Sequence, residues 1–214
     1  MFNVDDMLGQ HGSHRTALPK VGEAVRIVAI AFTLGVGLTG PAAANPDIWV
    51  TVKHVLRFDD AALTEISMDW TFDKYTSDRA ISHFDADGDG AFSDDEAKSL
   101  RVEAFDPLAQ NDYFVQLETA DQAIGTSVDG FRPWIDGDLL VFSFNAVPQD
   151  PVAYRQGPVS LSLYDRTIYF DFSFAEENFL LVDGPFDTAC RFRIESGDWP
   201  LEAHKKTVVL LCGE

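Results

Sequence analysis

A run of acidic, glycine and small residues at positions 85–96, DADGDGAFSDDE, constrains the local fold of this 214-residue chain more than any other segment. Apolar residues at helical spacing flank the run: Ile81 and Phe84 precede it, and Leu100 and Ala104 follow it. The pattern therefore predicts a helix, a tight polar loop and a second helix.

The oxygen-bearing residues of this run have the spacing of a calcium-binding EF-hand loop. Calcium takes about six to eight oxygen ligands, which a short loop supplies from alternate positions. The expected metal ligands, in chain order, are Asp85, Asp87, Asp89, Ala91, Ser93 and Glu96. Ala91 would bind through its backbone carbonyl, Ser93 through water and Glu96 with both carboxylate oxygens. Gly90 lies where the loop turns sharply, and calcium is the expected cofactor.

The same residues also fit a second interpretation. Ser93 followed by Glu96 is a capping box, in which the glutamate bonds backbone N–H groups at the start of a helix. The two interpretations are compatible, because the second helix needs an N-terminus in either case. No second loop of this kind occurs in the chain, which favours a structural ion over a calcium switch.

The N-terminal segment has the pattern of an export signal. Basic residues precede an apolar stretch at 27–38, and small residues follow it up to Ala44. We therefore expect a cleavable signal peptide at 1–44, cleavage after Ala44, and a single periplasmic domain at 45–214 with the EF-hand inserted at 74–106. Membrane anchoring is the alternative, although the apolar stretch is shorter than the ~20 residues that a spanning helix needs.

The net charge and the cysteines indicate which classes of partner and which compartment to expect. The formal net charge is -19, which disfavours nucleic acid and anionic membranes as partners. The only cysteines, Cys190 and Cys212, end two strand-like segments, so folding these segments into a hairpin would allow a disulfide in an oxidising compartment.

In most of the remaining chain, the sequence pattern predicts short strands. Segments 48–58 and 66–72 alternate or are rich in Val and aromatic residues, and we expect them to form a hairpin. Further strands are expected at 113–118, 139–145, 159–164, 167–174, 179–182, 190–194 and 208–212. The predicted fold is mainly β, an antiparallel β-sandwich or curved sheet with an inserted helix-loop-helix, hence α+β.

The order of several short motifs resembles a bacterial periplasmic family, domain of unknown function 1007. The motifs are residues 44–50 (ANPDIWV), 70–73 (WTFD), the 85–96 loop, 111–114 (NDYF) and 164–169 (YDRTIY). The resemblance implies a periplasmic component of an ABC-type transport system, in the neighbourhood of nickel or cobalt permeases. Members of that family typically carry histidines at the positions of Asn45 and Asp47. The resemblance therefore leaves the Asp47 carboxylate as a ligand for a hard metal ion at this terminus.

Two function classes remain open. The first is an exported calcium-binding accessory component of a metal-ion transport system, with a membrane metal permease or another periplasmic protein as partner. The second is a calcium-stabilised interaction module without a transported-metal site. His54, His83 and His204 are scattered in the sequence and predict structural roles. The chain lacks a nucleophile elbow, paired metal histidines and a phosphate loop, so we expect no enzyme activity.

Overall fold

The computed structural model describes residues 46–59, 62–155, 157–185, 190–197, 202 and 204–211. The expected signal peptide, 1–44, and its cleavage site after Ala44 lie outside the described residues. Among the helices that are described, none is long and apolar enough to cross a membrane.

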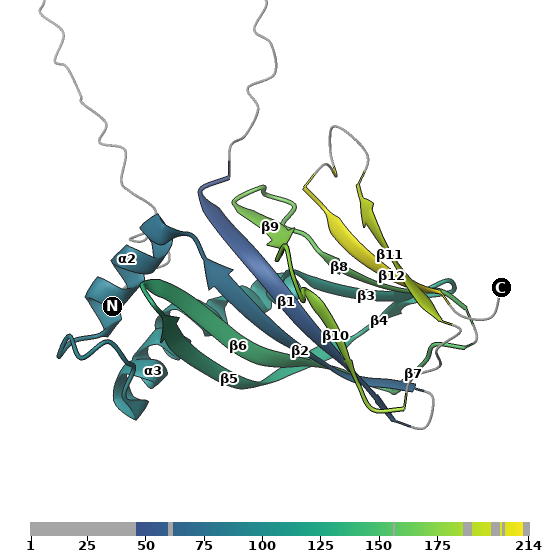
Figure 1. Ribbon diagram of the computed structural model, residues 1–214, viewed down its shortest axis with the longest axis horizontal. Coiled ribbons are helices and arrows are strands. Elements are labelled where there is room, and N and C mark those ends of the chain that lie inside the picture. Colours follow the sequence, from purple (N-terminus) through teal and green to yellow (C-terminus); the bar gives the residue numbers. More distant parts are fainter. Residues whose placement is uncertain are drawn as a thin grey trace, which may run out of the picture.

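Two β-sheets make up most of the described chain (Figure 1). The larger sheet has the order β10-β1-β2-β6-β5, with β9 also paired to β1 and β7 to β2. Its strands are β1 (Ile48–Asp59), β2 (Ala62–Phe72), β5 (Thr126–Asp136), β6 (Leu139–Pro148), β7 (Val152–Ala153), β9 (Phe170–Phe174) and β10 (Leu180–Asp183).

The smaller sheet has the order β11-β12-β8-β3-β4, and all its neighbouring strands are antiparallel. Its strands are β3 (Val115–Thr119), β4 (Ala123–Ile124), β8 (Val159–Leu163), β11 (Arg191–Ser196) and β12 (Lys206–Leu211).

The core lies where the apolar faces of the two sheets meet, since a single cluster of buried residues draws on both sheets. In β1 every second residue is buried, which is the period expected of a strand with one face in the core. Trp70 of β2 is fully buried, with its ring 5.0 Å from that of Phe144 and 5.1 Å from that of Phe172. The mainly β fold and the β1–β2 hairpin predicted from the sequence are confirmed.

The predicted antiparallel pairing holds for the other strand pairs, but β9 and β10 both pair with β1 in parallel. Ile48 lies opposite Phe170, and His54 lies opposite Leu180. The chain passes from β8 in the smaller sheet to β9 in the larger sheet, where β9 runs parallel to β1. Hydrophobic alternation carries no information about strand direction, and the sequence pattern therefore did not reveal this pairing.

The start of β3, the start of β9 and the whole of β5 also differ from the sequence prediction. Tyr113 and Phe114 precede β3 in a turn where Asp112, Tyr113 and Phe114 all have positive φ angles of 50°, 50° and 57°. Strand β9 begins only at Phe170, because residues 165–169 form a turn around the Asp165 carboxylate. Strand β5 was not predicted, since its apolar residues do not alternate regularly and Pro133 interrupts it.

A helical segment connects β2 to β3 and covers one end of the larger sheet (Figure 1). It comprises α2 (Lys74–Phe84), α3 (Asp94–Leu100), a π-helical turn (Arg101–Phe105) and a 3-10 segment (Asp106–Phe114). The segment therefore extends eight residues past the expected insertion end at position 106. Helix α2 contacts β6, and α3 contacts β5.

Buried hydrogen bonds fix α2 to the sheet. The Ser77 hydroxyl donates to the carbonyl of Phe72 at 3.1 Å and accepts from the backbone N–H of Leu140 at 2.9 Å. Asp73 caps the helix by accepting from the backbone N–H of Thr76 at 3.0 Å. These bonds therefore hold the first turn of α2 against the larger sheet.

Strands β11 and β12 form the predicted C-terminal hairpin, in which Arg191 lies opposite Leu211. Each of these residues is the sequence neighbour of a cysteine, Cys190 or Cys212. Cys212 lies outside the described residues, so the Cys190–Cys212 disulfide stays a prediction.

Candidate metal site

The loop between α2 and α3 groups three carboxylates. Asp85, Asp87 and Asp89 each offer an oxygen, and these oxygens all lie within 4.8 Å of one another. Two oxygens that bind one calcium ion at about 2.3–2.6 Å each lie at most about 5 Å apart. The spacing of the three carboxylates therefore suits a single hard cation.

Asp85 also organises the backbone of the loop. Its carboxylate accepts hydrogen bonds from the N–H groups of Gly88 at 2.9 Å, Asp89 at 3.2 Å and Gly90 at 3.1 Å. Further along, Asp89 accepts from the N–H of Ala91 at 2.9 Å. These bonds curl the chain so that the carboxylates converge, and each carboxylate oxygen keeps lone pairs for a metal.

Two glycines allow this curl. Gly88 has φ +70° and Gly90 has φ +82°, values that cost a residue with a side chain roughly 1–2 kcal/mol. A Cβ atom at either position would meet nothing within 4 Å, so the requirement comes from backbone conformation. Phe92, which follows the last of these turns, is half-buried and packs against the core.

Glu96 closes the loop on itself. Its Oε1 atom accepts from the N–H of Ala86 at 2.7 Å, and Oε2 accepts from the N–H of Ser93 at 2.9 Å and the hydroxyl of Ser93 at 2.8 Å. The hydrogen bonds from Ser93 and Ala86 lower the pKa of the Glu96 carboxyl. Ser93 and Glu96 form the capping box of α3, which is the compatible second interpretation of the sequence.

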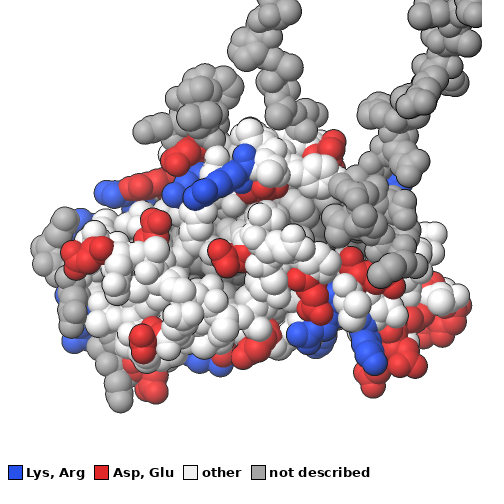
Figure 2. Space-filling model, turned by 180° about the vertical axis from the view of Figure 1, so that it is seen from behind, with Lys and Arg blue, Asp and Glu red and all other residues white. Residues whose placement is uncertain are grey.

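The site lies on the surface. Asp87 and Asp89 are exposed, and Asp85 and Glu96 are half-exposed. Acidic side chains gather at the end of the molecule that carries α2 and α3, as seen from behind in Figure 2. Solvent and ions therefore reach the loop directly, while the flanking Phe84 and Leu100 are buried.

The histidines do not form a second site within the described part of the chain. His83 is exposed, and its ring lies 4.7 Å from that of Phe84. His204 pairs with Asp171 at 3.1 Å. Among described residues, Asp85, Asp87 and Asp89 are the only group of three potential metal-binding side chains whose ligand atoms lie this close together.

His54 has a structural role that sequence position alone did not reveal. His54 is 1 % exposed, and its Nδ1 atom donates to the carbonyl of Phe179 at 3.3 Å, which ties the β9–β10 connection to β1. Burial lowers the pKa of His54 to about 4. Its Nε2 atom and the Trp70 Nε1 atom are buried without a hydrogen-bond partner among the described residues.

Fold and site together define a two-sheet, mainly β protein with a carboxylate-rich helix-loop-helix insertion. The model of one protein family, described as protein of unknown function (DUF1007), matches residues 30–208, which is most of the chain. The chain belongs to this family. A search of curated proteins found no match.

Proposed function

We propose that this chain is an exported protein that binds one calcium ion in an EF-hand loop at 85–96 and serves as an accessory, periplasmic component of a nickel- or cobalt-type metal transport system. One observation carries the calcium part of this proposal: the carboxylates of Asp85, Asp87 and Asp89 converge within 4.8 Å. Carboxylate oxygens are ligands that calcium prefers.

The remaining ligands come from the second half of the loop. The carbonyl of Ala91 and the carboxylate of Glu96 would complete the coordination, with a water molecule held by Ser93. Glu96 already bonds the backbone at both ends of the loop, so it is close to the chain segment that carries the other ligands. Direct binding by Glu96 would exchange some of these hydrogen bonds for the ion.

The anchoring of α2 supports a structural role for the ion. A sensor loop needs flanking helices that can move apart on binding. Here Ser77 joins α2 to both β2 and β6 through buried hydrogen bonds. We therefore propose that calcium stabilises the insertion and leaves the angle between α2 and α3 nearly unchanged.

Titration calorimetry of the chelator-stripped chain from residue 45 onward tests calcium binding. We expect one calcium per chain, with a dissociation constant of about 0.1–1 mM, as is common for extracellular loops. Asp87→Ala should abolish the binding heat. Asp95→Ala is the matched control, because Asp95 is an acidic residue of the same loop at a position that provides no ligand. Calcium heat in Asp87→Ala equal to that of the control would reject the site.

The transport role rests on the family resemblance and has its own test. Nickel, cobalt and zinc are titrated into the calcium-saturated protein. A further one-to-one binding event supports the transport-accessory function, and its absence rejects a transported-metal site in this protein.

A second candidate function is favoured by exposed apolar side chains on the helical segment. Tyr75 on α2 is 64 % exposed, and Val102 beyond α3 is 57 % exposed. These residues suit contact with a protein partner, so a calcium-stabilised interaction module is the alternative. It predicts that calcium is the only metal that binds, and that Tyr75→Ser and Val102→Ser leave calcium affinity unchanged.

A further inference from the structure

A pocket of about 470 Å³ lies at the end of the molecule where the chain passes between the two sheets. One wall comes from the β3–β4 turn and β4, and the other from the connection between β6 and β7. This volume falls within the range of small-molecule sites in proteins, about 300–1,000 Å³. The pocket is distinct from the 85–96 loop, since none of its lining residues belongs to that segment.

Backbone hydrogen bonds hold both walls in place. In the β3–β4 turn, Thr119 donates from its backbone N–H to the carbonyl of Gln122 at 2.9 Å. On the other wall, the N–H of Gln149 donates to the carbonyl of Gly125 at 2.9 Å. The shape of the pocket is therefore set by the fold before any ligand arrives.

Gly125 makes room for a polar group of the pocket. A Cβ atom at this position would lie 2.7 Å from the side-chain carboxamide carbon of Gln149. This distance is far below van der Waals contact, so the carboxamide occupies space that only glycine leaves free. Any side chain at position 125 would displace the Gln149 carboxamide.

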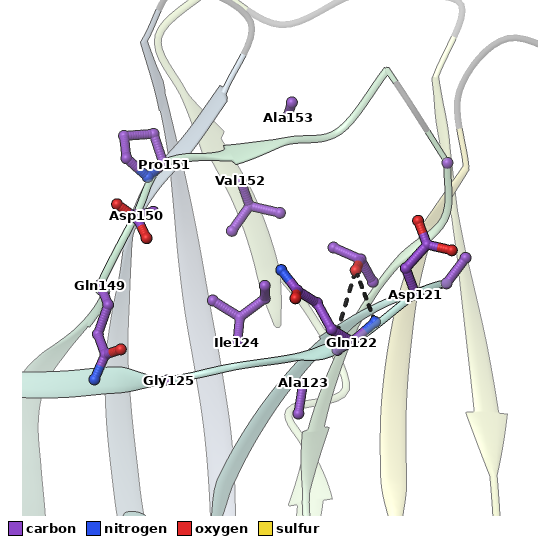
Figure 3. Close-up of a pocket in the computed structure, with 13 residues that line it drawn as sticks. Asp121, Gln122, Ala123, Ile124, Gly125, Gln149, Asp150, Pro151, Val152 and Ala153 are labelled. Atoms are coloured by element: carbon purple, nitrogen blue, oxygen red, sulfur yellow. Dashed lines mark hydrogen bonds between the residues drawn. The ribbon is translucent and has the colours of Figure 1, made fainter.

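The lining combines an apolar floor with acidic walls. Figure 3 shows Asp121 on one side and Asp150 on the opposite side, with Ile124 and Val152 between them. Val152 is buried, and Ile124 is half-buried. Among the lining residues that the structure describes, none is Lys, Arg or His. Within the described chain, neither carboxylate has a hydrogen-bond or ion-pair partner.

We propose that this pocket binds a small aliphatic diamine. Each ammonium group pairs with one of the two carboxylates, Asp121 and Asp150, and the methylene chain covers Ile124 and Val152. Figure 3 shows the Gln122 carboxamide beside Ile124 and the Gln149 carboxamide beside Gly125. An anionic ligand would meet two unpaired carboxylates and no cation on the described walls, and the net charge of -19 would repel it further.

Calorimetric titration of the calcium-saturated protein with cadaverine tests this proposal. The titration is made at about 0.15 M salt, because salt screens interactions with distant surface charges. We expect saturable one-to-one binding with a dissociation constant of about 1 mM. Asp121→Asn and Asp150→Asn should each weaken binding about fivefold, the effect of one solvent-accessible ion pair. Gly125→Ala should also weaken binding, because it displaces the Gln149 carboxamide.

Three controls separate the pocket from general attraction to an acidic protein. Glu177→Gln removes an exposed negative charge outside the pocket and should leave the cadaverine affinity unchanged. Pentylamine should bind about fivefold more weakly, because it has one ammonium group. Glutarate should not bind. Equal weakening by Glu177→Gln, equal affinity for pentylamine, or no saturable binding of cadaverine would each overturn the proposal.

Discussion

The Oε1 atom of Glu96 accepts a hydrogen bond from the backbone N–H of Ala86 at 2.7 Å, across ten positions of the chain. The second carboxylate oxygen of Glu96 bonds Ser93. One side chain thus joins the beginning of the 85–96 loop to the cap of α3. The loop is preorganised by the same carboxylates that calcium would use, so binding costs little further ordering of the chain.

Calcium should raise the thermal stability of the protein. Calcium at about 100 times its dissociation constant adds about 2.7 kcal/mol to the free energy of unfolding, which corresponds to a rise in Tm of roughly 5–10 °C. Asp87→Ala should remove this rise, and Asp95→Ala should keep it. Circular dichroism melts with calcium and with chelator measure the difference. An equal calcium-induced rise in both variants would show that the ion acts elsewhere.

Ser77→Ala should destabilise the protein by about 1–3 kcal/mol, because it leaves the buried carbonyl of Phe72 and the N–H of Leu140 without this partner. Urea unfolding followed by tryptophan fluorescence measures the change. Ser99→Ala is the matched control, since the Ser99 hydroxyl makes an exposed bond to the carbonyl of Asp95 within α3. Similar losses in both variants would contradict an anchoring role for Ser77.

Acid should destabilise the fold through His54. The folded-state pKa of about 4 lies below the ordinary value of 6.5, so the native state favours the neutral ring. The contribution of the neutral ring to the free energy of unfolding is fully present above pH 6.5. It is lost as the pH falls towards 4, and the total loss is roughly 3 kcal/mol. Urea unfolding between pH 7 and pH 4 measures the slope.

A His54→Leu variant isolates this effect of pH. His54→Leu should lose less stability than the wild type between pH 6.5 and pH 4, whatever its stability at neutral pH. A His54→Leu slope identical to that of the wild type would show that other groups cause the acid sensitivity.

Asp165→Ala should cost at least about 3 kcal/mol. Asp165 is 4 % exposed, and its carboxylate accepts hydrogen bonds from the N–H groups of Thr167, Tyr169 and Phe170. Its removal leaves these donors without their acceptor at the start of β9. Arg166→Ala, at an exposed neighbouring position, should change stability by less than about 0.5 kcal/mol. Chemical denaturation of both variants provides the comparison.

The predicted Cys190–Cys212 disulfide should stabilise the protein by roughly 3 kcal/mol, given the length of the loop that it closes. Mass spectrometry of the protein exported to an oxidising compartment should show two hydrogens fewer than the reduced chain. Reductant should lower the unfolding midpoint of the wild type and leave that of the Cys190→Ser/Cys212→Ser double variant unchanged. Free thiols in the exported protein would disprove the bond.

Local sequence patterns were sufficient for several features of the fold. The alternation in β1 and β2 revealed the first hairpin, because a strand with one face in the core repeats every two residues. The 85–96 pattern revealed the loop and the N-terminus of α3, because capping and turn formation involve residues within a few positions of one another. These interactions are encoded in short segments and can be recognised there.

The sequence by itself thus determined the strand-rich composition, the helix-loop-helix and the candidate ligands of its loop. Only the tertiary structure decided the parallel pairing of β9 and β10 with β1, the burial of His54, and the position of Asp121 opposite Asp150 across one pocket. Each of these depends on contacts between residues far apart in the chain. No local period or spacing specifies such contacts, because they form only when both sheets pack around a common core.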